Sequence, residues 1–303
     1  MALLTLIIAL LIERYYHKGD RIAQLNTRNK VSSNNWFISY QKQAVKMLSE
    51  YTWFQGWLKE ALLIVLPALI VFFIFQSVES GLVSSLIMLA LAVLILVHCL
   101  GPESPRKSLR GYFSDLENQD EQGAYQRAKV FSGKDAENWQ QTSDNVTHAI
   151  FKETQVRYFA VVIWFVLLGP AGALLYKLIG WYKQDNQPDT LAKNLLAVME
   201  WVPARISSLA YLLAGDMASG IKAIKRKFFD LDVDGLSLVE VTGVAAMGVL
   251  EVEKEEISHG DSHQESRLSL SSANRCALKL SERTGVILFA FVAIVSLLGW
   301  GFM

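Results

Sequence analysis

Three residues inside an apolar stretch are the strongest chemical signal in this 303-residue sequence. Glu200, Pro203 and Arg205 lie in the otherwise hydrophobic segment 195–213. Ionisable side chains at membrane depth are costly, and their usual role there is functional. Proline lacks a backbone N–H and breaks a helix, which hydrocarbon tolerates only where protein or water satisfies the freed groups. We therefore interpret this segment as the functional centre and expect its helix to break at Pro203.

A second group of charges lies on the preceding apolar span. Glu153 and Arg157 are four residues apart where a helix is expected to enter the membrane, so they can pair on one face. Lys177 falls in the last turn of the same span. Together with Glu200 and Arg205 these residues form a candidate polar cluster, whose basic members would engage an anionic ligand. The alternative is that Arg157 and Lys177 only reach the lipid headgroups with their long side chains.

An acidic segment is the weaker candidate site. Asp230, Asp232 and Asp234 alternate before Gly235, as in the first half of a calcium loop. The closing bidentate carboxylate is missing, because Val241 stands in its place. We therefore predict an acidic connection between helices and keep the three aspartates only as weak metal candidates. No cofactor is indicated, and no glycine-rich phosphate-binding motif occurs.

The apolar residues are gathered into blocks that are typical of membrane helices. A span needs about 20 apolar residues, and most of the charged residues fall between the blocks. The fold class predicted is all-α, a polytopic membrane protein with interrupted or re-entrant helices and cytoplasmic helical segments. It forms a single integral-membrane domain with membrane segments near residues 1–16, 61–76, 82–100, 157–180, 195–213 and 285–302.

The charge distribution predicts the topology. Net charge is zero, but Lys and Arg concentrate in the segments 17–60, 101–156 and 216–283, which the positive-inside rule places in the cytoplasm. Whether 195–213 crosses the bilayer or folds back stays open, because both arrangements keep 216–283 inside. Basic tracts with interleaved aromatic residues are absent, so a nucleic-acid partner is not expected. The lipid bilayer is the expected partner.

The span 157–180 carries its own interruption. Gly169, Pro170, Ala171 and Gly172 fall near its middle and would divide it into half-helices 156–168 and 173–181. Paired broken helices mark binding sites in transporters. The alternative is a kink with close helix packing through small residues.

Three blocks of sequence resemble a known family. They are the aromatic segment 157–165, the segment 169–177, and Trp-Val-Pro-Ala-Arg at 201–205. At these residues the chain resembles the AmpE family, which is related to the CobD/CbiB membrane synthases of cobalamin assembly. The resemblance covers essentially the whole chain. The synthases carry Glu-Asn-x-x-Asp-Gly at the membrane boundary, where this chain keeps Glu153 but has Arg157 and Tyr158 for the Asp and Gly.

The resemblance implies a regulatory or signalling protein of the bacterial inner membrane, linked to β-lactamase induction or cell-wall sensing. Its ligand would be an anionic small molecule or a cell-wall fragment. The alternative is a membrane-bound synthase or transferase related to cobinamide-phosphate synthase, with Glu153 as acid or base. Because the acidic motif is largely replaced, we expect a binding rather than a catalytic role. A homo-oligomer stays open.

Overall fold

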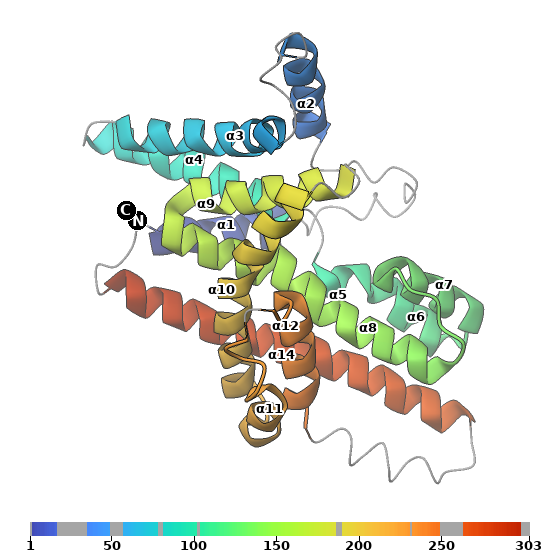
Figure 1. Cartoon of the computed structure of the whole chain (residues 1–303). Helices are drawn as coiled ribbons and strands as arrows, with labels where there is room; N and C mark the ends of the chain where they lie inside the picture. The colour runs from blue at the N-terminus through green and yellow to red at the C-terminus, as the bar shows by residue number, and fades with distance from the viewer. Residues whose placement is uncertain are drawn as a thin grey trace. The chain divides into compact units, whose positions relative to one another are not determined.

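A computed structural model describes residues 2–16, 35–48, 57–77, 81–101, 104–185, 190–230, 232–248 and 263–297 (Figure 1). All regular secondary structure in these ranges is helical, which confirms the predicted all-α class. The chain divides into two compact units. Unit 1 comprises Met1–Pro102, Ala160–Met199 and Val292–Met303, and unit 2 comprises Glu103–Phe159 and Glu200–Phe291.

Unit 1 is built around one long helix. Helix α9 packs against three others, α1, α3 and α4, and α1 also packs against α4 (Figure 1). Two aromatic residues of α2 lie beside the same group, since Trp36 Nε1 donates to His98 Nε2 of α4 at 2.7 Å and the Phe37 ring lies 6.2 Å from that of Trp181. The helices that contribute to this unit are α1 (Ala2–Tyr16), α2 (Asn35–Leu48), α3 (Trp57–Ser77), α4 (Leu82–Leu100), α9 (Ala160–Asp185), the first part of α10 (Thr190–Ala214) and the end of α14 (His263–Leu297).

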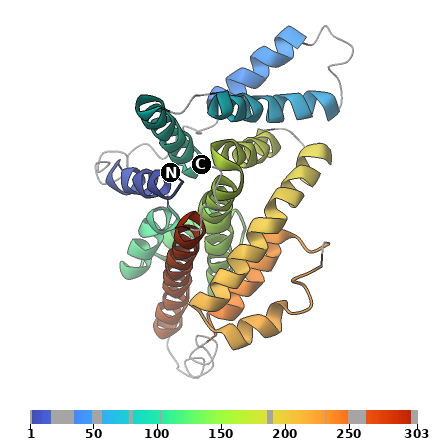
Figure 2. The same cartoon turned by 90° about the vertical axis from the view of Figure 1, so that its left-hand side faces the viewer.

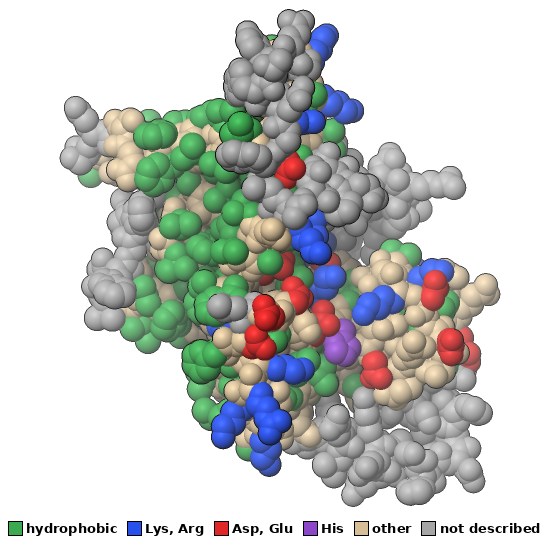
Figure 3. Space-filling view, in the orientation of Figure 1, with side chains coloured by type: hydrophobic (Ala, Val, Ile, Leu, Met, Phe, Trp, Pro, Cys, Tyr) green, Lys and Arg blue, Asp and Glu red, His purple; other side chains and the backbone are tan. Residues whose placement is uncertain are grey.

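Large apolar side chains cover the outside of α3 and α4, and the space-filling view shows them as a broad hydrophobic surface (Figure 3). Such a surface is unfavourable in water but not in lipid. Four helical stretches among the described residues are long and apolar enough to cross a membrane: Leu58–Ser77, α4 (Leu82–Leu100), Trp139–Lys183 and Ala192–Ala214. They contain the predicted segments 61–76, 82–100, 157–180 and 195–213. The two remaining predicted segments are 1–16 and 285–302. Met1 of the first and residues 298–302 of the second lie outside the described ranges.

The break predicted in the span 157–180 is confirmed. Gly169 leaves the helical conformation with φ 70° and ψ −163°, and Pro170 follows it. A positive φ of this kind is open to glycine and strained for other residues. Gly172 allows close packing one turn later, since a Cβ there would lie 2.8 Å from the Trp164 carbonyl oxygen. The interruption is therefore a glycine kink followed by a proline, within α9.

Unit 2 combines several short helices with most of the long helix α14. A buried amide ties three of its helices together, because Asn274 Oδ1 accepts from Ser143 and Thr147 of α8 and its Nδ2 donates to Tyr112 Oη at 3.0 Å. The helices are α5 (Pro105–Ser108), α6 (Arg110–Glu117), α7 (Glu121–Ser132), α8 (Trp139–Thr154), the π-helix η2 (Gln155–Phe159), the rest of α10, α11 (Met217–Ile224), α12 (Gly235–Ala246) and most of α14 (His263–Leu297).

Helix α12 lies close to both α8 and α10 (Figure 2). Its glycines allow this approach. A Cβ on Gly243 would lie 2.7 Å from the Phe151 ring, and one on Gly235 would lie 2.9 Å from the Glu200 carbonyl oxygen. Between α12 and α10, the Thr242 and Ser208 hydroxyl groups hydrogen-bond at 3.3 Å.

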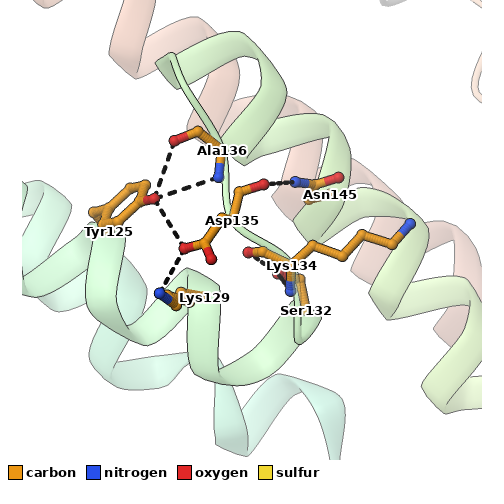
Figure 4. A network of polar contacts seen from close by, with 7 residues as sticks. All are labelled: Tyr125, Lys129, Ser132, Lys134, Asp135, Ala136 and Asn145. Carbon is orange, nitrogen blue, oxygen red and sulfur yellow. Dashed lines mark hydrogen bonds and ion pairs between the residues drawn. The ribbon is translucent and has the colours of Figure 1, made fainter.

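The connection between α7 and α8 is held by side-chain contacts (Figure 4). Lys129 Nζ lies 2.6 Å from Asp135 Oδ1, and this contact raises the pKa of Lys129 and lowers that of Asp135. Tyr125 Oη donates to the Ala136 carbonyl at 3.0 Å. Gly133 ends α7 with φ +69°. This segment is therefore a capped helix connection.

Candidate functional site

Glu153 and Arg157 pair as predicted. Arg157 Nε donates to Glu153 Oε2 at 2.7 Å, and about a third of each side chain remains exposed, 27% for Arg157 and 35% for Glu153. The pair straddles the boundary between α8 and η2. Single turns of π-helix inside longer helices occur frequently at functional sites. The polar pair and the irregular turn therefore mark the same place on the chain.

Gln155, the first residue of η2, is a functional candidate that sequence analysis missed. It is 1% exposed, and neither Oε1 nor Nε2 has a hydrogen-bond partner in the part of the chain that the structure describes. Phe151 and Phe159 lie four residues before and after it, and both rings contact the Tyr211 ring, at 5.3 and 5.8 Å between centroids. Gln155 thus sits on the face of η2 that packs against α10. A buried amide without partners is costly, so this face suits a polar group brought by a ligand or by water.

The facing side of α10 carries further hydroxyl groups. Ser207 lies one turn before Tyr211 and is fully buried, and its Oγ has no partner among the described residues. Tyr211 Oη lies 3.2 Å from Ser281 Oγ of α14. In the sequence, this face is indicated by small polar residues at helical spacing in an apolar segment, next to the more prominent charged residues.

Pro203 does not break α10, contrary to expectation. The helix runs without interruption from Thr190 to Ala214. Proline removes the N–H that would bond the carbonyl four residues earlier, which here is the Met199 carbonyl. Trp164 Nε1 of α9 donates to that oxygen at 2.9 Å. The helix continues because a neighbouring indole replaces the missing backbone donor.

Arg205 is buried, 6% exposed, and its guanidinium is held by backbone carbonyls. Nη2 donates to Asp230 O at 2.7 Å, Nε to Phe228 O at 3.1 Å, and Nη1 to Trp201 O at 3.3 Å. The guanidinium also lies 4.3 Å from the centre of the Trp201 ring, a cation–π distance. Arg205 therefore fixes the segment after α11 to α10, which leaves less of its hydrogen-bonding capacity for a ligand.

The other predicted site residues are divided between the units. Glu200 is 6% exposed and belongs to unit 2 with Glu153, Arg157 and Arg205, whereas Lys177 lies on α9 in unit 1. Glu153 and Arg157 form the contact that the sequence predicted. The larger cluster, with Pro203 included, stays a prediction.

Two of the three aspartates, Asp230 and Asp234, accept hydrogen bonds from the backbone. Asp230 Oδ1 accepts from the backbone N–H of Asp232 at 3.0 Å. Asp234 caps α12 by accepting from Ser237 N at 3.1 Å. Within the described residues, no group of three or more acidic, His or Cys side chains is arranged to hold a metal ion. These hydrogen bonds lie in the connection between α11 and α12, and metal binding by the aspartates stays a weak candidate.

Apolar helices of membrane-crossing length, together with buried ionisable residues between them, define a polytopic α-helical membrane protein. The family model described as CobD/Cbib protein matches residues 6–232, well over half of the chain. The chain belongs to the CobD/CbiB family. No curated protein sequence and no solved structure gave a match. The predicted relation to these synthases is thereby confirmed, and the match includes Glu153, the π-helix and Arg205.

Proposed function

We propose that this protein is a membrane-bound synthase or transferase of the cobalamin-assembly type, acting at the face shared by η2 and α10. The observation that carries the proposal is the family match across residues 6–232, which includes this face. The replaced acidic motif led us to expect a binding role rather than a catalytic one. The family match favours the synthase alternative instead. Synthases of this kind couple an acid on a corrinoid to an aminopropanol, so the substrates proposed are a carboxylate, an amine and a nucleoside triphosphate that activates the carboxylate, whose lost oxygen leaves with phosphate.

Glu153 is the residue proposed to act as acid or base. It is the one carboxylate kept from the acidic motif, and its side chain is partly open to solvent. Gln155 and Ser207 would hydrogen-bond the polar groups of the substrate, since their own polar atoms lack protein partners among the described residues.

A second candidate is the regulatory role that the AmpE resemblance implies. The Glu153–Arg157 contact favours the regulatory role. Arg157 stands where the synthases have an aspartate, and its guanidinium hydrogen-bonds Glu153, the one acid of the motif that remains. In this role Arg157 would bind an anionic ligand, and the protein would report the bound state to an inner-membrane partner. Arg205 is less suited to test this role, because its replacement would also release the segment at Phe228 and Asp230.

Turnover by the purified full chain separates the two candidates. Wild-type protein, Glu153→Gln and the control Glu137→Gln are assayed with a panel of corrinoid carboxylates, aminopropanol phosphates and nucleoside triphosphates. The proposal expects amide formation that falls about 100-fold or more in Glu153→Gln, as loss of a general base does, and is unchanged in the control. Tight binding of one compound without turnover would instead support the regulatory role. Arg157→Gln should then abolish β-lactamase induction while inserting normally.

A further inference from the structure

The segment 217–229, which is α11 and the turn after it, carries two kinds of exposed side chain that seldom share a surface in water. Its basic residues are all exposed, and so are three large apolar ones, with Phe229 at 83%. Lys and Arg side chains gather over α11 in the space-filling view (Figure 3). We call this the α11 surface, and its residues are Met217, Ile221, Lys222, Lys225, Arg226, Lys227 and Phe229.

The packing of α11 determines which of its faces is exposed. Gly220 and Ile224 are buried, and a side chain at Gly220 would collide with Leu212 of α10. Ile224 joins Leu212 and Leu238 in a small core cluster. The opposite face carries the α11 surface, so its apolar residues are not a misplaced part of the core.

The acidic residues near this surface do not neutralise it through ion pairs. Asp216 caps α11, accepting from the Ala218 and Ser219 backbone, and Asp234 caps α12. Asp230 accepts from the backbone of Asp232. In the described part of the chain, none of these carboxylates forms an ion pair with the four basic side chains. The basic groups are therefore available to an external anion.

The place of the α11 surface in the chain indicates what that anion is. The membrane-capable stretch of α10 ends at Ala214, three residues before Met217. A basic segment directly after a membrane helix meets the phosphates of anionic lipids. Exposed apolar side chains on the same face suit burial at the boundary between headgroups and acyl chains. A soluble acidic partner would account for the lysines but not for Phe229.

We propose that the α11 surface binds anionic lipids of the membrane, with its basic residues on lipid phosphates and Met217, Ile221 and Phe229 inserted below them. This proposal does not depend on the reaction proposed above. It has a structural consequence, because Phe228 and Asp230, whose carbonyls bind Arg205, adjoin the inserted Phe229. Lipid binding would thereby stabilise the segment that Arg205 holds.

Native mass spectrometry of the full chain in detergent tests the proposal with phosphatidylglycerol and phosphatidylcholine as probes. The basic-loss variant is K222Q/K225Q/R226Q/K227Q. The control removes three lysines and one arginine from other exposed positions of unit 2, as R110Q/K134Q/K152Q/K279Q. We expect the basic-loss variant to bind phosphatidylglycerol about tenfold more weakly, with phosphatidylcholine binding unchanged, and the control to bind like wild type. High salt should weaken the wild type more than the variant.

A second variant tests the apolar part of the surface. M217S/I221S/F229S keeps all four positive charges and should still lose phosphatidylglycerol binding severalfold, because insertion of apolar side chains contributes to the affinity. Matching thermal unfolding of all variants establishes that they fold. Phosphatidylglycerol binding equal to wild type in the basic-loss variant, or an equal loss in the control, would overturn the proposal. Equal wild-type affinity for the two lipids would overturn it as well.

Discussion

Individual charged residues of this protein are held by specific partners even where they are buried. Arg205 satisfies part of its guanidinium with the carbonyls of Trp201, Phe228 and Asp230. Arg157 donates to Glu153 within one turn. Burying a charge without such partners costs far more than burying an apolar group. At this scale, Gln155 differs from the charged residues, because its buried amide has no partner in the described structure.

Replacement of Arg205 by lysine should destabilise the protein by about 2 kcal/mol. Lysine keeps the charge but cannot donate to Phe228 and Asp230 with one planar group, and hydrogen bonds from charged donors contribute about 1.5–3 kcal/mol each. Denaturant unfolding in micelles measures the loss, and hydrogen exchange should rise in residues 225–234. Arg226→Lys, at an exposed position, serves as the control. Unchanged stability and exchange in Arg205→Lys would show that Arg205 does not fix this segment.

The helices of this protein tolerate irregularities because a neighbouring group satisfies the backbone. In α10, Pro203 leaves the Met199 carbonyl without its helical donor, and Trp164 supplies one. In α9, Gly169 adopts a positive φ that permits the kink before Pro170. The π-helix between α8 and α9 begins at the buried Gln155, and the rings of Phe151 and Phe159, four residues to either side, contact the Tyr211 ring.

The Trp164–Met199 hydrogen bond should depend on Pro203. Trp164→Phe removes the donor and should cost about 1 kcal/mol beyond its loss of packing. In a Pro203→Ala background, the alanine N–H can bond the Met199 carbonyl, so this additional cost should disappear. Unfolding of the four proteins in a double-mutant cycle measures the coupling. Independent effects of the two substitutions would show that the indole does not compensate for the proline.

For the whole molecule, the distribution of exposed apolar residues is what distinguishes it from a soluble protein. Leu82, Leu86 and Leu94 on α4 are each more than 60% exposed, and Phe73 on α3 is comparable. In a membrane these side chains meet lipid at no cost. The family match supports the same environment, since CobD/CbiB proteins are membrane proteins.

A charge on the lipid-facing side of α4 should impair membrane insertion. Leu94→Lys introduces an ammonium group near the middle of a membrane-capable helix, which costs about 2.5–3.5 kcal/mol on insertion scales. Val130→Lys is the matched control, because Val130 is 83% exposed on α7 but lies outside the membrane-capable helices. The amount of each variant in the membrane fraction is the measurement. Equal insertion of the two variants would contradict the assignment of α4 to the bilayer.

Hydropathy and spacing alone determined the fold class, the apolar helices, the break at Gly169 and the Glu153–Arg157 contact. These features depend on local geometry: an apolar helix long enough to span, a glycine before a proline, and side chains four residues apart on one face. Tertiary structure alone decided that α10 continues through Pro203. The compensating indole belongs to Trp164, which lies 35 positions before Met199, whose carbonyl it binds. The surroundings of Arg205 and Gln155 could not be predicted from the sequence for the same reason. The carbonyls that hold Arg205 and the helix face that buries Gln155 are brought together only by packing between distant segments.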